Sequence, residues 1–130
     1  MFYIIKMPND CDNYLTITSE FPDELTQLIQ NEFQYKSNES DEYLFRQTVK
    51  IQKRGCRGIQ LRVWSAWQPD FEWLEGLLDK YPTAWIKNDW IEEGGFAGIW
   101  IGTRTDGEKN IRHFEWVDLC IEAKHYLFTP

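Results

Sequence analysis

The adjacent carboxylates Glu92 and Glu93 are the first candidates for chemistry, because Gly94 and Gly95 follow them directly and would place them on a turn. Two acidic side chains at one site can share a proton and act in general acid–base catalysis. Neighbouring residues on an extended chain point in opposite directions, however, so this pair is poorly placed to share one. The pattern favours a solvated hairpin turn in which glycine supplies a positive φ.

Cysteine and histidine could act as metal ligands or as a nucleophile and its base. Their positions form neither a Cys-x-x-Cys pair nor a histidine pair at helical spacing: Cys11, Cys56, Cys120, His113 and His125. A cysteine nucleophile also needs a nearby histidine and a third orienting group, and the spacing establishes neither. We therefore expect no metal, no cofactor and no enzymatic activity. An unusually reactive Cys56 or Cys120 would reopen the enzyme hypothesis.

A basic segment with neighbouring tryptophans gives a second kind of candidate site. Cations gather over residues 50–62, and Trp64 and Trp67 follow directly. Single-stranded nucleic acids bind to grooves that combine positive charge with aromatic stacking platforms. The residues that would serve such a site are Arg54, Arg57, Arg62, Trp64 and Trp67.

The net charge of the chain, in contrast, disfavours nucleic-acid binding. The 130 residues include 21 acidic and 14 basic ones, which gives a formal net charge of −7. A negative surface repels phosphate backbones and suits contact with a basic protein surface. Glu92 and Glu93 are the first acidic group to test, and Asp41 and Glu42 are the second.

Composition also limits the class of protein. Hydrophobic residues make up 42% and aromatic residues 16%, which is too rich for a disordered chain. The longest apolar runs are too short to cross a bilayer, and residues 1–6 do not resemble a secretion signal, so we expect no membrane contact. An odd, scattered set of three cysteines fits a reducing cytoplasm.

Hydrophobic periodicity predicts the elements that would hold these residues. Helices are expected from Pro22 through residue 33 and from Pro69 to Pro82, because each proline starts or stops a repeat of apolar residues. Alternation predicts strands or extended segments at 14–18, 43–51, 59–64, 84–91, 96–103 and 114–122. Residues 34–42 are polar and are expected to form a loop.

This order predicts an α+β fold of the ferredoxin-like, split βαβ type. Its antiparallel sheet would have two helices on one face and one or more extra C-terminal strands. No linker or internal repeat divides the chain, so residues 1–130 are expected to form a single domain. An open sheet edge could support a homodimer.

Several short motifs, taken in order, resemble the YubB ferredoxin-like family of plasmid- and phage-borne proteins. An early Cys-x-Asn pair precedes a Leu-x-Ile strand, and a tryptophan strand leads to Trp-x-Pro, a helix and Tyr-Pro. An acidic turn then enters Gly-Phe-Ala-Gly. The matching positions are Cys11, Asn13, Trp64, Ser65, Trp67, Pro69, Tyr81, Pro82 and residues 92–98.

The resemblance runs from Cys11 to Gly98, with residues 34–58 unmatched. Residues 1–10 form an extra lead, and Asp10 stands where the family usually has a tryptophan. The resemblance implies a ferredoxin-like fold and an origin in a mobile genetic element. It implies no settled activity, so it transfers no catalytic residue.

These observations predict a non-enzymatic, acidic binding protein that acts through protein–protein interaction. Its partner would be a host protein or one from a competing element. Such a chain could inhibit a defence or nucleic-acid-handling protein by presenting carboxylates in place of phosphates. The alternative is a single-stranded nucleic-acid binder that uses the basic hairpin 50–62 with Trp64 and Trp67.

Overall fold

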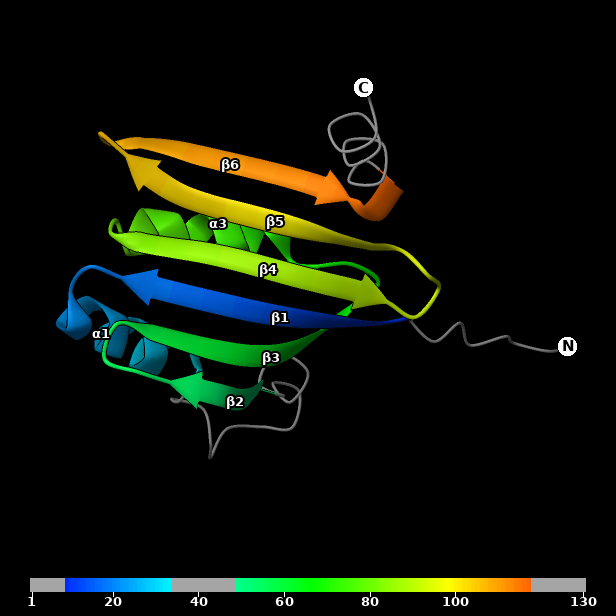
Figure 1. Cartoon of the computed structure of the whole chain (residues 1–130), viewed down its shortest axis with the longest axis horizontal. Coiled ribbons are helices and arrows are strands. Elements are labelled where there is room, and N and C mark those ends of the chain that lie inside the picture. Colours follow the sequence, from blue (N-terminus) through cyan, green and yellow to red (C-terminus); the bar gives the residue numbers. More distant parts are fainter. Residues whose placement is uncertain (1–8, 34–48, 118–130) are drawn as a thin grey trace, which may run out of the picture.

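An antiparallel sheet organises the molecule (Figure 1). The computed structural model describes residues 9–33 and 49–117, and this part contains six strands. They are β1 (Asp10–Ser19), β2 (Val49–Arg54), β3 (Gly58–Ala66), β4 (Ala84–Glu92), β5 (Ala97–Thr105) and β6 (Glu108–Glu115). Their order across the sheet is β2-β3-β1-β4-β5-β6, and all neighbours are antiparallel.

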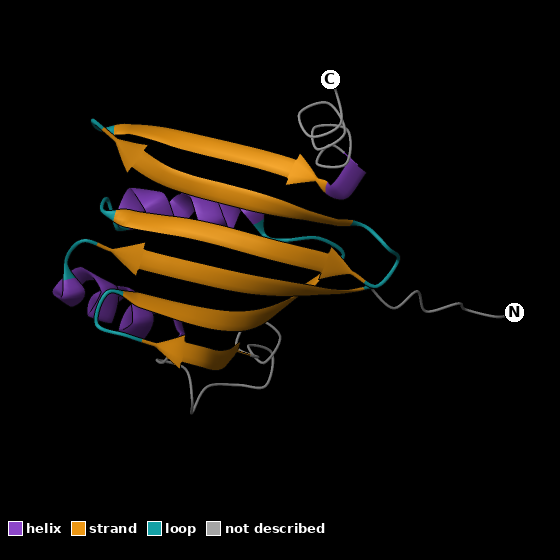
Figure 2. Ribbon diagram, viewed as in Figure 1, coloured by secondary structure: helices purple, strands orange, loops and turns teal. Residues whose placement is uncertain are grey.

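Two helices cover one face of this sheet, α1 (Pro22–Phe33) and α3 (Phe71–Lys80) (Figure 2). Each helix has acidic residues in its first turn, where the helix dipole favours negative charge. The Asp70 side chain caps α3 by accepting a hydrogen bond from the Trp73 backbone N–H at 3.1 Å. Neither helix in the described residues is long and apolar enough to span a membrane.

The core lies between the helices and the sheet, because every second residue of the inner strands points toward the helices. On β1, for example, Leu15 and Ile17 are buried while Tyr14 and Thr16 on the other face are half-buried. The core residues include Leu15, Ile17, Leu25, Leu28, Ile59, Leu61, Leu74, Leu77, Leu78, Ile86 and Trp100.

Two tight turns extend the sheet beyond β4. Gly95 has φ +102° in the turn before β5, and the Glu92 backbone N–H donates to the Phe96 carbonyl at 2.7 Å. Asp106 and Gly107 have φ 53° and 82° in the turn before β6, a combination that hairpins with two-residue turns require. Because both turns are short, β5 and β6 pair directly with their predecessors.

The ferredoxin-like prediction is corrected by this sheet. Extra C-terminal strands were expected, and β5 and β6 follow β4, but the six-strand order β2-β3-β1-β4-β5-β6 and the placement of the helices differ from the ferredoxin-like arrangement. Helix α3 packs on β4 and β5, so the core spreads toward the additional strands. The fold is a sheet-dominated α+β arrangement of six antiparallel strands and two helices within the described residues. The fold that the YubB resemblance implies is corrected with it.

Most predicted elements exist, but several bounds differ. The helix expected from Pro69 to Pro82 begins at Phe71, after the Asp70 cap, and ends at Lys80, before Tyr81. The strand expected over 43–51 is β2 over Val49–Arg54, and residues 43–48 lie outside the described residues, as does the loop 34–42. β6 spans Glu108–Glu115, so it starts before the extended segment expected over 114–122, because the Asp106-Gly107 turn begins it earlier. Residues 118–122 of that expected segment lie outside the described residues.

Candidate functional site

The face of the sheet opposite the helices is not covered by any described helix, and we call it the open face (Figure 1). Strand register places its side chains in rows across the sheet. It includes Asp12, Tyr14, Thr16, Thr18, Lys50, Lys53, Gln60, Arg62, Trp64, Trp85, Lys87, Asp89, Ile91, Ile99, Ile101, Thr103, Asn110, Arg112 and Phe114. This face therefore mixes cations, aromatic rings and hydroxyls, which a face built only for packing does not need.

Arg62 shows how the charges on the open face are arranged. Its guanidinium donates to both carboxylate oxygens of Asp12, at 3.2 and 3.0 Å, and lies 5.7 Å from the centre of the Tyr14 ring. The paired carboxylate raises the pKa of the Arg62 guanidinium. Lys87 is similarly paired with Asp89 at 3.3 Å.

Large apolar side chains are exposed at the end of the sheet where β3, β4 and β6 finish and where β1 and β5 begin. We call this surface the aromatic end, and it consists of Trp67, Ile91, Phe96, Trp116 and Val117. The exposed fractions are 45% for Trp67, 66% for Phe96 and 56% for Trp116. The C-terminal ends of β3 and β6 are four strand spacings apart in the sheet, so the surface is about 20 Å wide. Exposed apolar side chains that gather at one end of a sheet are candidates for an interaction site.

Trp67 is held in an unusual backbone conformation by its neighbours. Its φ is 70°, a region that a bulky residue rarely adopts. The Trp67 backbone N–H donates to the Asn9 carbonyl at 2.8 Å, and the Ser65 hydroxyl donates to the Gln68 carbonyl at 2.8 Å. These bonds fix the chain on both sides of Trp67.

A buried amide network supports the same turn from inside. The Asn13 side chain donates to the Ser65 hydroxyl at 2.8 Å and to the Val63 carbonyl at 3.0 Å, and it accepts from the Asn88 amide at 2.9 Å. Asn13 and Asn88 are both buried. The Asn13 of the Cys-x-Asn motif therefore has a positioning role, linking β1, β3 and β4 behind Trp67.

Glu92 also has a positioning role. Only 5% of it is exposed, and its Oε1 accepts hydrogen bonds from the Gly94 backbone N–H and from the Asn9 side-chain amide, both at 2.6 Å. A carboxylate that accepts two such bonds orders the turn that carries Phe96. The expectation of a fully solvated turn is therefore wrong for Glu92, because the turn folds back over its side chain.

The predicted acidic surface is only partly present among the described residues. Glu92 is buried, so its carboxylate is not available to a partner. Glu93 is exposed, and its Oε1 accepts a hydrogen bond from the Asp10 backbone N–H at 3.0 Å. Asp41 and Glu42 lie outside the described residues.

The predicted basic set is divided between different places. Arg62 and Trp64 share the open face, where the Trp64 indole N–H donates to the Asp10 carboxylate at 2.7 Å. Arg54 pairs with the core residue Ile59 across the strands, on the helix-covered face, and its guanidinium donates to the Gly55 carbonyl. Arg57 is in the β2–β3 turn, and Trp67 is at the opposite end of β3.

The candidates for metal or thiol chemistry are not brought together. Among the described residues, no group of three His, Cys, Asp or Glu side chains could hold a metal ion. Cys11 is buried, and burial is the main reason that the pKa of its thiol is raised. A hydrogen bond with Ser65 lowers this pKa, while the charges of Asp12 and Glu92 raise it further. Cys56 is exposed in the β2–β3 turn. Cys120 and His125 lie outside the described residues, and His113 packs against Phe71 at 4.7 Å between ring centres.

The sequence reasoning missed the aromatic end as a surface. A signal was available in Trp67 and Phe96, because Trp67 follows the expected strand 59–64 and Phe96 directly follows the Gly94-Gly95 turn. Trp116 gave no such signal, since it was expected inside an extended segment. Comparisons with protein-family models, with curated proteins and with solved structures found no match. The resemblance to the YubB family thus stays a prediction.

Proposed function

We propose that this chain is a non-enzymatic binding protein that occupies a surface of another protein through its aromatic end. The observation that supports the proposal is the exposure of Trp67, Phe96 and Trp116 around one end of the sheet. Tryptophan is enriched among the residues that dominate binding energy at protein interfaces. A width of about 20 Å suits a standard interface of about 800 Å² per partner.

The way Trp67 is held supports the same proposal. A side chain fixed before binding loses less conformational entropy when a partner covers it. Trp67 is fixed by hydrogen bonds on both sides and by the Asn13 network, and Phe96 stands on the turn that Glu92 orders. Backbone strain at an exposed aromatic residue is common at binding sites.

For the biological role, we propose inhibition of a host or competing-element protein by a phage- or plasmid-encoded chain. This part rests on the resemblance to the YubB family and on the net charge of −7, which suits a partner with a basic surface. We do not extend the proposal to phosphate mimicry at Glu92, because that carboxylate is buried.

The test is retention of a partner by the immobilised full chain from bacterial lysate treated with nuclease. The variants are Trp67→Ala and Phe96→Ala, and the matched control is Phe21→Ala. Phe21 is 56% exposed and lies before α1, at the opposite end of the sheet. We expect the wild type and Phe21→Ala to retain one stoichiometric protein that both aromatic-end variants lose.

Two results would contradict the proposal. One is a partner that the Trp67→Ala and Phe96→Ala variants retain as well as the wild type does. The other is equal loss from Phe21→Ala, which would indicate nonspecific adhesion of exposed aromatic rings. Circular dichroism of each variant establishes that the comparison is made between folded proteins.

A further inference from the structure

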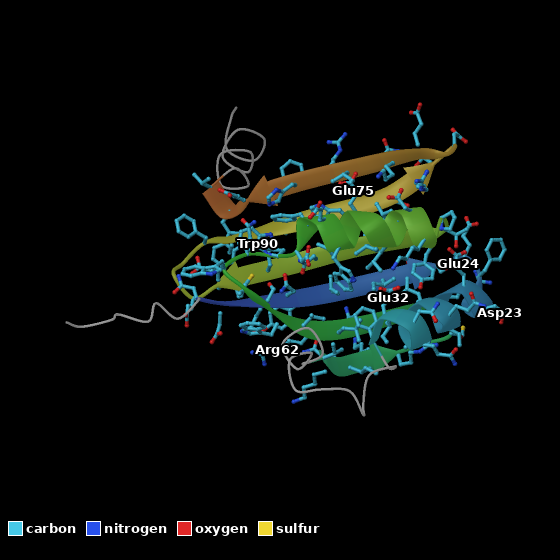
Figure 3. All side chains as sticks on the ribbon, turned by 180° about the vertical axis from the view of Figure 1, so that it is seen from behind. Asp23, Glu24, Glu32, Arg62, Glu75 and Trp90 are labelled. Atoms are coloured by element: carbon cyan, nitrogen blue, oxygen red, sulfur yellow. The ribbon has the colours of Figure 1, made fainter. Side chains whose placement is uncertain are left out.

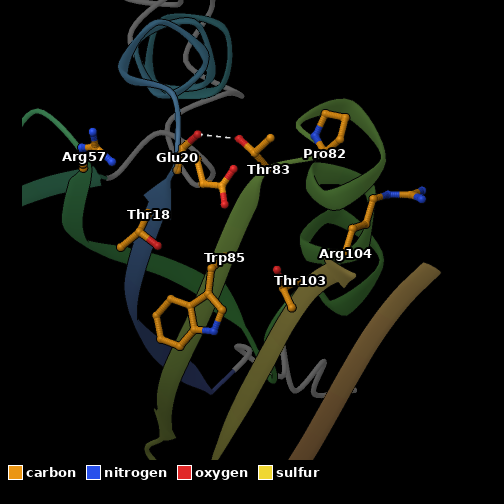
Figure 4. Close-up of a pocket in the computed structure, with 9 residues that line it drawn as sticks. Thr18, Glu20, Arg57, Pro82, Thr83, Trp85, Thr103 and Arg104 are labelled. Atoms are coloured by element: carbon orange, nitrogen blue, oxygen red, sulfur yellow. Dashed lines mark hydrogen bonds between the residues drawn. The ribbon is translucent and has the colours of Figure 1, made fainter. Parts of the chain in front are cut away.

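Two adjoining hollows lie near the β2–β3 turn, at the end of the sheet opposite the aromatic end, and open-face residues line part of each. Their volumes are about 470 and 510 Å³, and both are lined by Thr18 and Arg57. Trp85 lines the first hollow and Lys53 the second. Short side chains on the strands beneath, such as Thr18 in both hollows and Gly58 in the second, leave the space that forms them. Figure 4 shows the Trp85 ring between Thr18 and Thr103, with Arg57 beyond Thr18.

The charge around these hollows is locally positive in an acidic protein. Residues 49–58 contain four cations and no acidic residue: Lys50, Lys53, Arg54 and Arg57. Glu20 is the carboxylate that lines the first hollow. Arg104 also lines it, but its guanidinium is turned away and donates to the Leu78 and Gly107 carbonyls and to Asp79 (Figure 4). Arg57 and Lys53 are therefore the cations that face a ligand here.

Strand register adds a row of cations that continues from the hollows. Lys53 pairs with Gln60, Gln60 with Thr16, and Thr16 with Lys87. The same row continues from Lys87 through Ile101 to Arg112. The five strand spacings from Lys53 to Arg112 cover about 24 Å. Lys53 and Arg112 are exposed, and Lys87 is half-buried beside Asp89.

We infer that the open face is a second binding site, and that its ligand is single-stranded nucleic acid lying across the strands along the Lys53–Lys87–Arg112 row. The phosphates contact these cations and Arg57, and a base stacks on Trp85, two residues from Lys87 on the same face. A track of about 24 Å holds about four nucleotides, which is the lower limit for single-domain binders. This site is separate from the aromatic end and does not require the proposed protein partner.

The experiment is fluorescence anisotropy of a labelled oligothymidine with the full chain at low salt. We expect Lys53→Glu combined with Arg57→Glu to weaken binding at least tenfold. Loss of two phosphate contacts should make the slope of log K against log salt shallower by about 1.4. Trp85→Ala should weaken binding, and Trp85→Phe should restore most of it, because phenylalanine keeps a stacking surface.

The matched control is Lys80→Glu, which changes the net charge as Lys53→Glu does but lies on α3, behind the sheet. It should bind oligothymidine within about twofold of the wild type, since distant charges are screened by salt. Equal losses from Lys80→Glu and Lys53→Glu would overturn the site, as would failure of the wild type to bind. A third result would also overturn the site: Lys53→Glu fails to retain a protein that the wild type retains after nuclease treatment, and neither chain binds oligothymidine. That result would assign the open face to a protein partner. The aromatic-end variants test the proposed function independently.

Discussion

Trp67 combines an exposed aromatic ring with a backbone conformation that costs free energy. For a residue with a Cβ atom, a left-handed conformation costs about 1–2 kcal/mol. The cost is offset by the bonds from Trp67 N–H to Asn9 and from the Ser65 hydroxyl to Gln68, and by the Asn13 amide behind Ser65. A glycine would adopt this turn more easily, whereas tryptophan adds a large exposed ring at that cost.

Comparing two truncations at this position isolates the backbone cost from the ring. Both Trp67→Gly and Trp67→Ala remove the ring, but only glycine adopts φ 70° without strain. We expect Trp67→Gly to be more stable than Trp67→Ala by about 1 kcal/mol in urea unfolding. An alanine variant as stable as the glycine variant would show that the turn relaxes and holds no strain.

The two described cysteines should differ in reactivity. Cys11 is fully buried, and its pKa is raised mainly by burial, so the reactive thiolate is disfavoured in the folded protein. Cys56 is exposed and should react with N-ethylmaleimide while Cys11 stays protected, as measured by peptide mass spectrometry. In urea both should react. Labelling of Cys11 at the rate of Cys56 in the folded protein would contradict its burial.

The raised pKa of Cys11 also predicts how the free energy of unfolding changes with pH. The folded protein holds the Cys11 proton more tightly than the unfolded chain does, because only the unfolded thiol ionises at its ordinary pKa of about 8.5. Stability from this group is therefore complete below that pH and is lost as the pH rises above it. We expect Cys11→Ser to show a smaller decline in unfolding free energy than the wild type between neutral and alkaline pH.

At the scale of elements, two glycines allow β4 and β5 to hold large indole rings. A Cβ at Gly98 would lie 2.5 Å from the Phe114 carbonyl oxygen and 2.9 Å from the Trp90 ring. A Cβ at Gly102 would lie 2.5 Å from the Trp100 ring. Gly98 pairs directly with Trp90 across the strands. The glycines of β5 therefore make space for the tryptophans.

Substitution of these glycines should be costly in proportion to the space that they leave. Gly98→Ala should lower the unfolding free energy by about 1–3 kcal/mol, because the Phe114 carbonyl is backbone and cannot rotate away. The matched control is Gly76→Ala, where a Cβ meets nothing within 4 Å on α3. This control should raise stability by up to about 1 kcal/mol, since alanine favours helix. Equal effects of the two changes would contradict the packing argument.

Local patterns predicted elements well where one physical signal dominates. Proline indicated the start of α3 to within two residues, and alternation predicted β1 and β3. The extent of the sheet was predicted less well. Alternation placed the last extended segment from residue 114, whereas the Asp106-Gly107 turn starts β6 at Glu108. Gly98 was expected within the strand over 96–103, but nothing local indicates that a ring from the neighbouring strand lies over it.

At the scale of the molecule, the sequence identified cations and tryptophans but could not place them relative to one another. Arg57 and Trp67 are separated by ten positions, and β3 between them is extended, so they lie about 30 Å apart. Alternation placed Arg62 and Trp64 on one face correctly. The burial of Glu92 depends on Asn9 and on the fold of the turn, which no spacing rule describes.

Charge is also distributed unevenly over the molecule. The helix side carries Asp23, Glu24, Glu32 and Glu75, as Figure 3 shows from behind, while the row from Lys53 to Arg112 lies on the open face. Several of these carboxylates already have partners, such as Glu32 with Tyr81 at 3.0 Å and Glu75 with Lys109 at 2.9 Å. The net charge of −7 therefore describes the molecule as a whole and does not describe the open face.

This separation predicts that salt weakens binding strongly on the open face and only slightly at the aromatic end. Oligothymidine held by four lysine or arginine contacts, those of Lys53, Arg57, Lys87 and Arg112, should bind about fiftyfold more weakly when the salt concentration is raised fourfold, because condensed ions compete for the phosphates. A protein partner held by Trp67, Phe96 and Trp116 should weaken severalfold less than oligothymidine does, since apolar burial is not screened and only the attraction between the acidic chain and a basic partner is. Titrations of each ligand at both salt concentrations measure this, with Trp67→Ala and Lys53→Glu as reciprocal controls. Should Lys53→Glu abolish the protein partner as well, the two ends would be one continuous surface with one occupant.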